Sequence, residues 1–152
     1  MAAIEESIVI KVGADAAYEP WTHLEQLPRF VEGVYRVDAD PDSPDRMHWE
    51  FDSGGGVYHN LTVDITERTP GRSLEFRFSG GSQKSLRVTF EPEGGEATKV
   101  TMFIEADTED HLDDIRLRRR VEANLERLKE LLEPHDASDR GRRGPSEPPQ
   151  PN

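Results

Sequence analysis

Cysteine is absent from the 152-residue sequence, and its absence excludes several kinds of site at once. Disulfides, zinc–thiolate centres and thiol nucleophiles all require it. Histidine offers no replacement, because His23, His48 and His111 do not keep a helical or alternating register with the acidic or histidine partners of a metal site. We therefore predict that the protein holds no metal ion, and no motif indicates another cofactor.

Long apolar runs are also missing. No stretch approaches about 18 apolar residues, and the amino-terminal segment lacks the basic region of a signal peptide. We expect a cytoplasmic protein without stable membrane insertion. Acidic residues outnumber basic ones by 31 to 19, which gives a formal net charge of −12. Such a surface repels phosphate groups, so nucleic acids are not expected partners.

One basic run, Arg116 to Arg120, looks like an anion-binding site when it is taken alone. Asp113, Asp114 and Glu122 lie three or four residues from its arginines, at the spacing where helical side chains meet. We interpret the run as a solvated, ion-paired helix face.

The length of the chain predicts a single hydrophobic core. Residues 135–152 carry four of the eleven prolines and no apolar side chain larger than alanine, so they cannot offset the entropy lost on ordering. The sequence therefore predicts one domain over residues 1–133 and a disordered tail over residues 134–152.

Apolar and polar residues alternate over residues 7–12, which predicts a first strand. A helical stripe broken by Pro20 and Pro28 follows between residues 16 and 30, and it predicts two short helices, the first capped by Asp15. Six further strands are separated by clusters of turn residues, such as those at 40–45. These strands are predicted at 34–39, 47–52, 57–67, 73–79, 85–91 and 98–106.

One face of the predicted strands is apolar and the other mostly polar, so one face forms the core. Residues 110–133 contain no glycine or proline and carry an apolar stripe at helical spacing. The stripe consists of Leu117, Val121, Leu125, Leu128 and Leu132. Its available partner is the apolar face of the sheet. The sequence thus predicts an α+β fold, in which a curved antiparallel sheet of seven strands wraps around a long C-terminal helix.

Three stretches of the chain resemble the polyketide cyclase/dehydrase family of the START-like (SRPBCC) superfamily, which has the helix-grip fold. They are residues 16–34, residues 63–67 with Pro70-Gly71, and residues 88–92 with 119–122 and 125–130. The resemblance implies a deep cavity between sheet and helix that takes lipids, quinones, hormones or polyketides. In some members the guest is cyclised or dehydrated. The family has no universal catalytic motif, so the resemblance identifies no catalytic residue.

The leading functional hypothesis is the binding of a hydrophobic small molecule, such as a lipid, a quinone or a polyketide-like compound. An aromatase/cyclase or dehydratase is the alternative, and it would need a general acid or base inside the cavity. His59, Tyr18, Tyr35 and Arg87 are possible groups. A second alternative is a protein-interaction module with a protein partner.

The candidate ligand-cavity residues are those that the strand and helix periodicities turn inward. They are Trp49, Phe51, His59, Leu61, Val63, Phe76, Phe78, Val88, Met102, Leu117, Val121 and Leu125. His59 is the polar member, and it can hydrogen-bond a ligand oxygen or move a proton near neutral pH. A histidine at a strand end is more often solvated, and the aromatic residues can also simply fill the core.

Removal of residues 135–152 should leave the fold and the melting temperature essentially unchanged, because this segment has no large apolar side chain to bury. Thermal unfolding of the full-length and shortened proteins measures the effect. A melting temperature lowered by several degrees would show that the segment docks on the domain.

Overall fold

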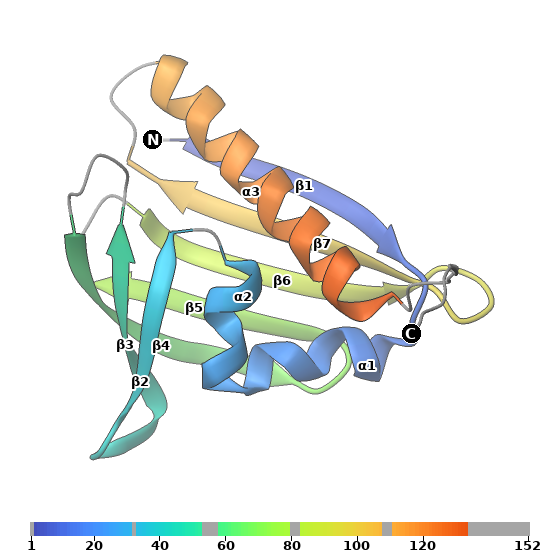
Figure 1. Ribbon diagram of the computed structural model, residues 1–152, viewed down its shortest axis with the longest axis horizontal. Coiled ribbons are helices and arrows are strands. Elements are labelled where there is room, and N and C mark those ends of the chain that lie inside the picture. Colours follow the sequence, from blue (N-terminus) through green and yellow to red (C-terminus); the bar gives the residue numbers. More distant parts are fainter. Residues whose placement is uncertain (1, 32, 53–57, 80–82, 108–110, 134–152) are drawn as a thin grey trace, which may run out of the picture.

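The computed structural model describes residues 2–31, 33–52, 58–79, 83–107 and 111–133. Seven strands form one antiparallel sheet in the order β1-β7-β6-β5-β4-β3-β2 (Figure 1). The strands are β1 (Ala2–Ile10), β2 (Val34–Asp40), β3 (Ser43–Asp52), β4 (Tyr58–Thr69), β5 (Ser73–Ser79), β6 (Gln83–Pro92) and β7 (Thr98–Ala106). The helical segments are α1 (Ala14–Tyr18), the 3₁₀ turns η1 (Glu19–Thr22) and η2 (Leu24–Gln26), α2 (Leu27–Phe30) and α3 (His111–Leu132). The predicted tail lies outside the described residues.

The sheet curves around α3, which lies along its concave face (Figure 1). Four residues of the predicted stripe are buried and the fifth is half-buried against the core. They are Leu117, Val121, Leu125 and Leu128, followed by Leu132. The predicted α+β helix-grip fold is confirmed. Within the described residues, no helix combines the length and the apolarity needed to cross a membrane.

The C-terminal end of α3 is tied to the end of β1 by polar contacts. The Lys129 ammonium donates to the carbonyl of Val9 at 3.1 Å and to the carboxylate of Glu133 at 2.5 Å. The same carboxylate accepts the backbone N–H of Lys11 at 3.0 Å. Burial alone would raise the pKa of Glu133, but the hydrogen bonds from Lys129 and Lys11 outweigh it and hold that pKa below its usual 4.5. These contacts therefore fix the C-terminal end of α3 to the sheet.

The first strand begins earlier than predicted. β1 spans Ala2–Ile10 instead of residues 7–12, and it pairs with β7 over its whole length. The alternation did not reveal the first half of the strand because of Glu6. This charged residue is in phase with Ile8, at a position where an apolar residue was expected. The structure pairs Glu6 with Arg118 of α3. The helix therefore supplies the opposite charge that allows an acidic residue on the side of the strand that faces it.

The connection from β1 to β2 is more broken than the predicted pair of helices. α1 begins at Ala14 with Gly13 in the N-cap position and no side-chain cap, so the prediction that Asp15 caps this helix is wrong. Pro20 and Pro28 stand in the first turns of η1 and α2. Proline is tolerated there because the first N–H groups of a helix have no partner within it. Each proline thus starts a new segment.

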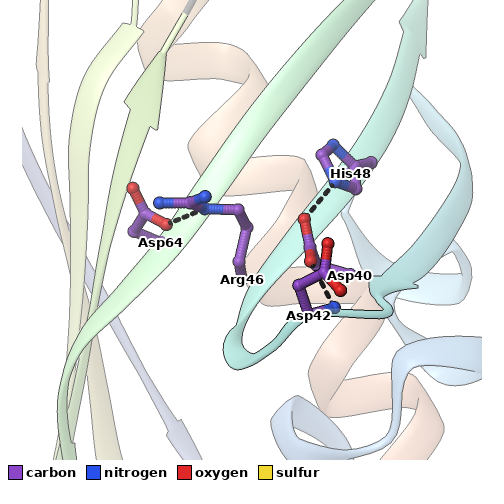
Figure 2. A network of polar contacts seen from close by, with 5 residues as sticks. All are labelled: Asp40, Asp42, Arg46, His48 and Asp64. Carbon is purple, nitrogen blue, oxygen red and sulfur yellow. Dashed lines mark hydrogen bonds and ion pairs between the residues drawn. The ribbon is translucent and has the colours of Figure 1, made fainter.

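The hairpin between β2 and β3 is tighter than predicted, because β3 begins at Ser43, opposite Asp40. One carboxylate oxygen of Asp40 accepts the N–H of Asp42 at 2.7 Å, and the other lies 2.9 Å from Nε2 of His48 (Figure 2). The backbone hydrogen bond from Asp42, followed by the contact with His48, holds the pKa of Asp40 below its usual 3.8. The other strand boundaries after β1 agree with the predictions within two residues.

Leu128→Ala should lower the free energy of unfolding by about 2 to 5 kcal/mol, because this side chain is fully buried between α3 and the sheet. Leu125→Ala should behave in the same way. Glu126→Ala, at an exposed position of the same turn, should change it by less than about 0.5 kcal/mol. Urea unfolding measures all three variants. Equal losses would mean that another face of α3 meets the sheet.

Glu133→Gln should lower the free energy of unfolding at neutral pH by less than about 1 kcal/mol, because the carboxylate is partly solvated. A carboxylate with a lowered pKa stabilises the folded state above the usual 4.5, and this contribution is lost as the pH falls through the lowered value. The difference from wild type should therefore vanish in acid. Urea unfolding across the pH range tests this. Glu130→Gln removes the same charge from an exposed position, and an identical pH profile for that variant would contradict the assignment.

Candidate functional site

A small cavity lies between α3 and the concave face of the sheet, close to the C-terminal end of β3. Strands supply most of its wall, and α3 contributes two polar side chains. The lining consists of Val31, Val34, Trp49, Phe51, Leu61, Phe78, Leu86, Met102, Ile104, Arg120 and Asn124. The volume of about 20 Å³ is enough for about one water molecule.

Aromatic side chains fill the interior beside this cavity. Trp49 meets Phe78 and Phe76 edge-on, with ring centroids 5.4 and 6.1 Å away. Trp21 packs against Phe30 with centroids 4.8 Å apart. Ligand sites commonly have volumes of about 300 to 1,000 Å³. The cavity that the described residues enclose is far smaller than this range, because large rings occupy the space beside it, and a ligand could occupy this region only if side chains or α3 moved.

Arg120 and Asn124 lie one turn apart on α3, on the flank opposite the residues that contact β1. Arg120 is half-buried, and its guanidinium carbon lies 4.9 Å from the centroid of the Phe51 ring. This distance is that of a cation–π contact. Asn124 is 3% exposed, which is unusual for an amide on the apolar side of a helix. Both polar groups therefore belong to the wall of the cavity.

The prediction of a solvated, ion-paired face for the run Arg116 to Arg120 is right in part. Arg116 lies 3.7 Å from Asp113, at the expected helical spacing. Arg120 is half-buried and also lies over an aromatic ring of the sheet. The charge pattern could not distinguish the two arginines, because their difference depends on which flank of α3 faces the end of β3.

Gly33 shapes the backbone next to Phe51. Its φ of +90° lies in the left-handed region, and its carbonyl accepts the N–H of Asp52 at 2.8 Å. A Cβ at this position would lie 3.0 Å from the Phe51 ring. Glycine therefore permits both the turn into β2 and the close packing of the ring that Arg120 covers.

The predicted cavity residues separate into three groups. Those in the lining are Trp49, Phe51, Leu61, Phe78 and Met102. Those buried in the core outside the lining are Val63, Phe76, Val88, Leu117, Val121 and Leu125. His59 stands opposite Phe51 in the β3–β4 ladder but is exposed and lies outside the lining. The alternation identified its side of the sheet, and its position near the start of β4 exposes it to solvent.

The lining also contains residues that were not among the predicted cavity residues. Leu86 and Ile104 follow the strand alternation, so that pattern could have identified them. Asn124 lies three residues after Val121 and four before Leu128, so its place on the buried stripe was a usable signal. Val31 and Val34 line the cavity because of the path that the chain takes into β2, and the periodicity of apolar residues does not predict that path.

The side chains considered for acid–base catalysis lie outside the lining as well. Tyr18 is buried on α1 with its ring 5.6 Å from that of Phe90, and burial raises the pKa of its hydroxyl above the usual 10.0. Arg87 is exposed, 3.7 Å from Glu67, and Tyr35 is 50% exposed. The geometry therefore assigns no catalytic residue.

Histidine and acidic residues form no group of three or more metal ligands in the part of the chain that the structure describes. His48 does have an acidic partner, Asp40, across the β2–β3 hairpin, which the register did not predict. Figure 2 shows this pair beside Arg46, whose Nε lies 2.8 Å from Asp64. These contacts stabilise the hairpin and the pairing of β3 with β4.

Comparison with known proteins places this arrangement in a family. The model of the family described as polyketide cyclase / dehydrase and lipid transport matches residues 1–133. An uncharacterized 17.2 kDa protein of Streptomyces lincolnensis, from the melC2-rnhH intergenic region, is 29% identical over 150 residues. The match covers 95% of this chain and 98% of that protein.

Solved structures share the fold at low sequence identity. A conserved protein from Geobacillus kaustophilus has a TM-score of 0.73 and 11% identity, over 86% of this chain and 95% of the other. The di-domain ARO/CYC BexL of the BE-7585A biosynthetic pathway has a TM-score of 0.67 and 20% identity, over 86% of this chain and 46% of the other. The family match includes all seven strands, α3 and every residue of the cavity lining, and the chain belongs to the polyketide cyclase / dehydrase and lipid transport family.

Proposed function

We propose that the protein binds a hydrophobic small molecule, such as a lipid, a quinone or a polyketide-like compound, between α3 and the sheet. The observation that carries the proposal is the composition of the cavity wall, in which nine of the eleven residues are apolar. Family membership supports it, because the family description includes lipid transport.

Burial of apolar surface is the main source of affinity in this proposal. Each Å² of apolar surface removed from water contributes about 25 cal/mol. The formal charge of −12 offers an anionic ligand no long-range attraction. Affinity should therefore depend little on ionic strength, since burial is hardly screened by salt.

Entry of a ligand requires the interior to open, and the contacts of α3 indicate where. One flank of the helix is held to β1 by Arg118 and Lys129. The opposite flank, with Arg120, meets the ring of Phe51. We propose that the ligand enters on this second flank, where Val34 at the start of β2 also borders the cavity.

Cyclisation or dehydration would require a general acid or base in contact with the ligand. The groups considered for that role lie outside the lining. They are His59, Tyr18, Tyr35 and Arg87. The likeness to BexL is one of fold at 20% identity and does not carry its activity over. The proposed function is therefore binding, without an assigned reaction.

Nile red, a neutral apolar fluorophore, should bind the wild-type protein at one site per chain with little dependence on salt. Leu61→Ala should raise its affinity severalfold, because Leu61 lines the cavity and its truncation enlarges the space. Leu74→Ala removes the same atoms from a buried position outside the lining and should leave the affinity unchanged. Both variants should lose about 2 to 5 kcal/mol of stability. Fluorescence titration and urea unfolding measure the two effects.

Equal affinities in the two leucine variants would place the probe elsewhere on the molecule. If neither the wild type nor Leu61→Ala takes up Nile red, the interior is a solid core. A protein-interaction module would then be the better account of this chain.

A further inference from the structure

Trp49 presents a buried hydrogen-bond donor without an acceptor. Its side chain is 3% exposed and lines the cavity, and its Nε1 has no hydrogen-bond partner among the described residues. A buried N–H group that makes no hydrogen bond destabilises the conformation in which it stays unpaired. The indole N–H of Trp21, the other tryptophan of the chain, is also unpartnered there, but Trp21 lies outside the lining.

Two more residues whose side chains carry donor groups line the same cavity. Arg120 and Asn124 reach it from α3, while Trp49 reaches it from β3. Because the cavity is about the size of a water molecule, the side chains that line it surround one small region. Arginine and tryptophan side chains carry hydrogen-bond donors and no acceptor, and the asparagine amide can donate as well. The region is therefore suited to an acceptor atom.

We propose that the ligand carries a neutral carbonyl oxygen, which accepts hydrogen bonds from Trp49, Arg120 and Asn124 while its apolar body lies between α3 and the sheet. The inference rests on the proposed function and specifies its ligand as a ketone or quinone with an apolar skeleton. The contact with Phe51 limits the orientations of the Arg120 guanidinium and so prepares it for one acceptor position. The acidic exterior offers a carboxylate no long-range attraction.

A matched pair of probes tests the carbonyl directly. 9-Fluorenone and fluorene have the same three-ring skeleton and differ by one carbonyl group in place of a methylene. The wild-type protein should bind fluorenone about tenfold more tightly than fluorene, as expected for one added hydrogen-bonded group. Quenching of tryptophan fluorescence or calorimetric titration gives both dissociation constants.

Variants on α3 assign the preference to named side chains. Arg120→Met keeps an unbranched stem over Phe51 but removes the donors, and Asn124→Leu removes the amide at similar volume. Each should lower the affinity for fluorenone toward that for fluorene and leave fluorene binding unchanged. Arg118→Met is the matched control, because Arg118 pairs with Glu6 on the β1 side of the helix, and it should preserve the preference.

The indole protons give a readout that does not depend on affinity. The chain has two tryptophans, so two indole N–H signals are expected in a proton–nitrogen correlation spectrum, and Trp21→Phe assigns them. Fluorenone should move the Trp49 signal downfield, as hydrogen bonding does, more than fluorene moves it. The Trp21 signal should move less.

Equal affinities for the two probes, or a preference that survives both Arg120→Met and Asn124→Leu, would overturn the inference and leave the proposed binding function intact. Absence of binding by both probes would contradict the proposed function and this inference together. Loss of the preference in Arg118→Met to the same extent as in Arg120→Met would also overturn it, because the effect would then be one of helix charge.

Discussion

The contact between the apolar stripe of α3 and the concave face of the sheet is the interaction on which the rest of the structure depends. An antiparallel sheet with one apolar face is stable only when that face is covered. α3 covers it with Leu117, Val121, Leu125 and Leu128, all of them buried. One flank of the helix is then tied to β1, and the other brings Arg120 and Asn124 to the cavity. The element that closes the core thus also provides the polar groups of the candidate site.

A filled interior and a ligand-binding role make opposite demands on the same side chains. Trp49, Phe76 and Phe78 pack edge-on, and such contacts favour the closed form. Nε1 of Trp49, which has no hydrogen-bond partner in the part of the chain that the structure describes, acts against the closed form, since a buried unsatisfied donor costs about 1 to 3 kcal/mol. A ligand that fills the interior and accepts that hydrogen bond would shift the population toward an open form by its differential affinity alone. The small cavity is consistent with such an equilibrium.

Most of the fold could be predicted from the sequence, because the strands and α3 repeat their apolar residues with strong periods. Prediction failed where the environment of a single side chain depends on the tertiary structure. Glu6 interrupts the apolar alternation of β1 with a charged side chain. Its partner, Arg118, is far away in the sequence, so no local pattern could indicate that a charge is tolerated there. His59 followed the alternation but lies in solvent near a strand end. The amount of space inside the sheet depends on how large rings pack, and composition does not report it.

The central claim is that the interior between α3 and the sheet opens to receive an apolar molecule. Methyl-labelled methionine gives a direct test, because Met102 lines the cavity and Met47 is buried outside the lining. In a complex with a bound apolar ligand, the account predicts nuclear Overhauser effects from ligand protons to the methyl group of Met102, much stronger than any to Met47. A bound ligand with no such contact to Met102 would contradict the account.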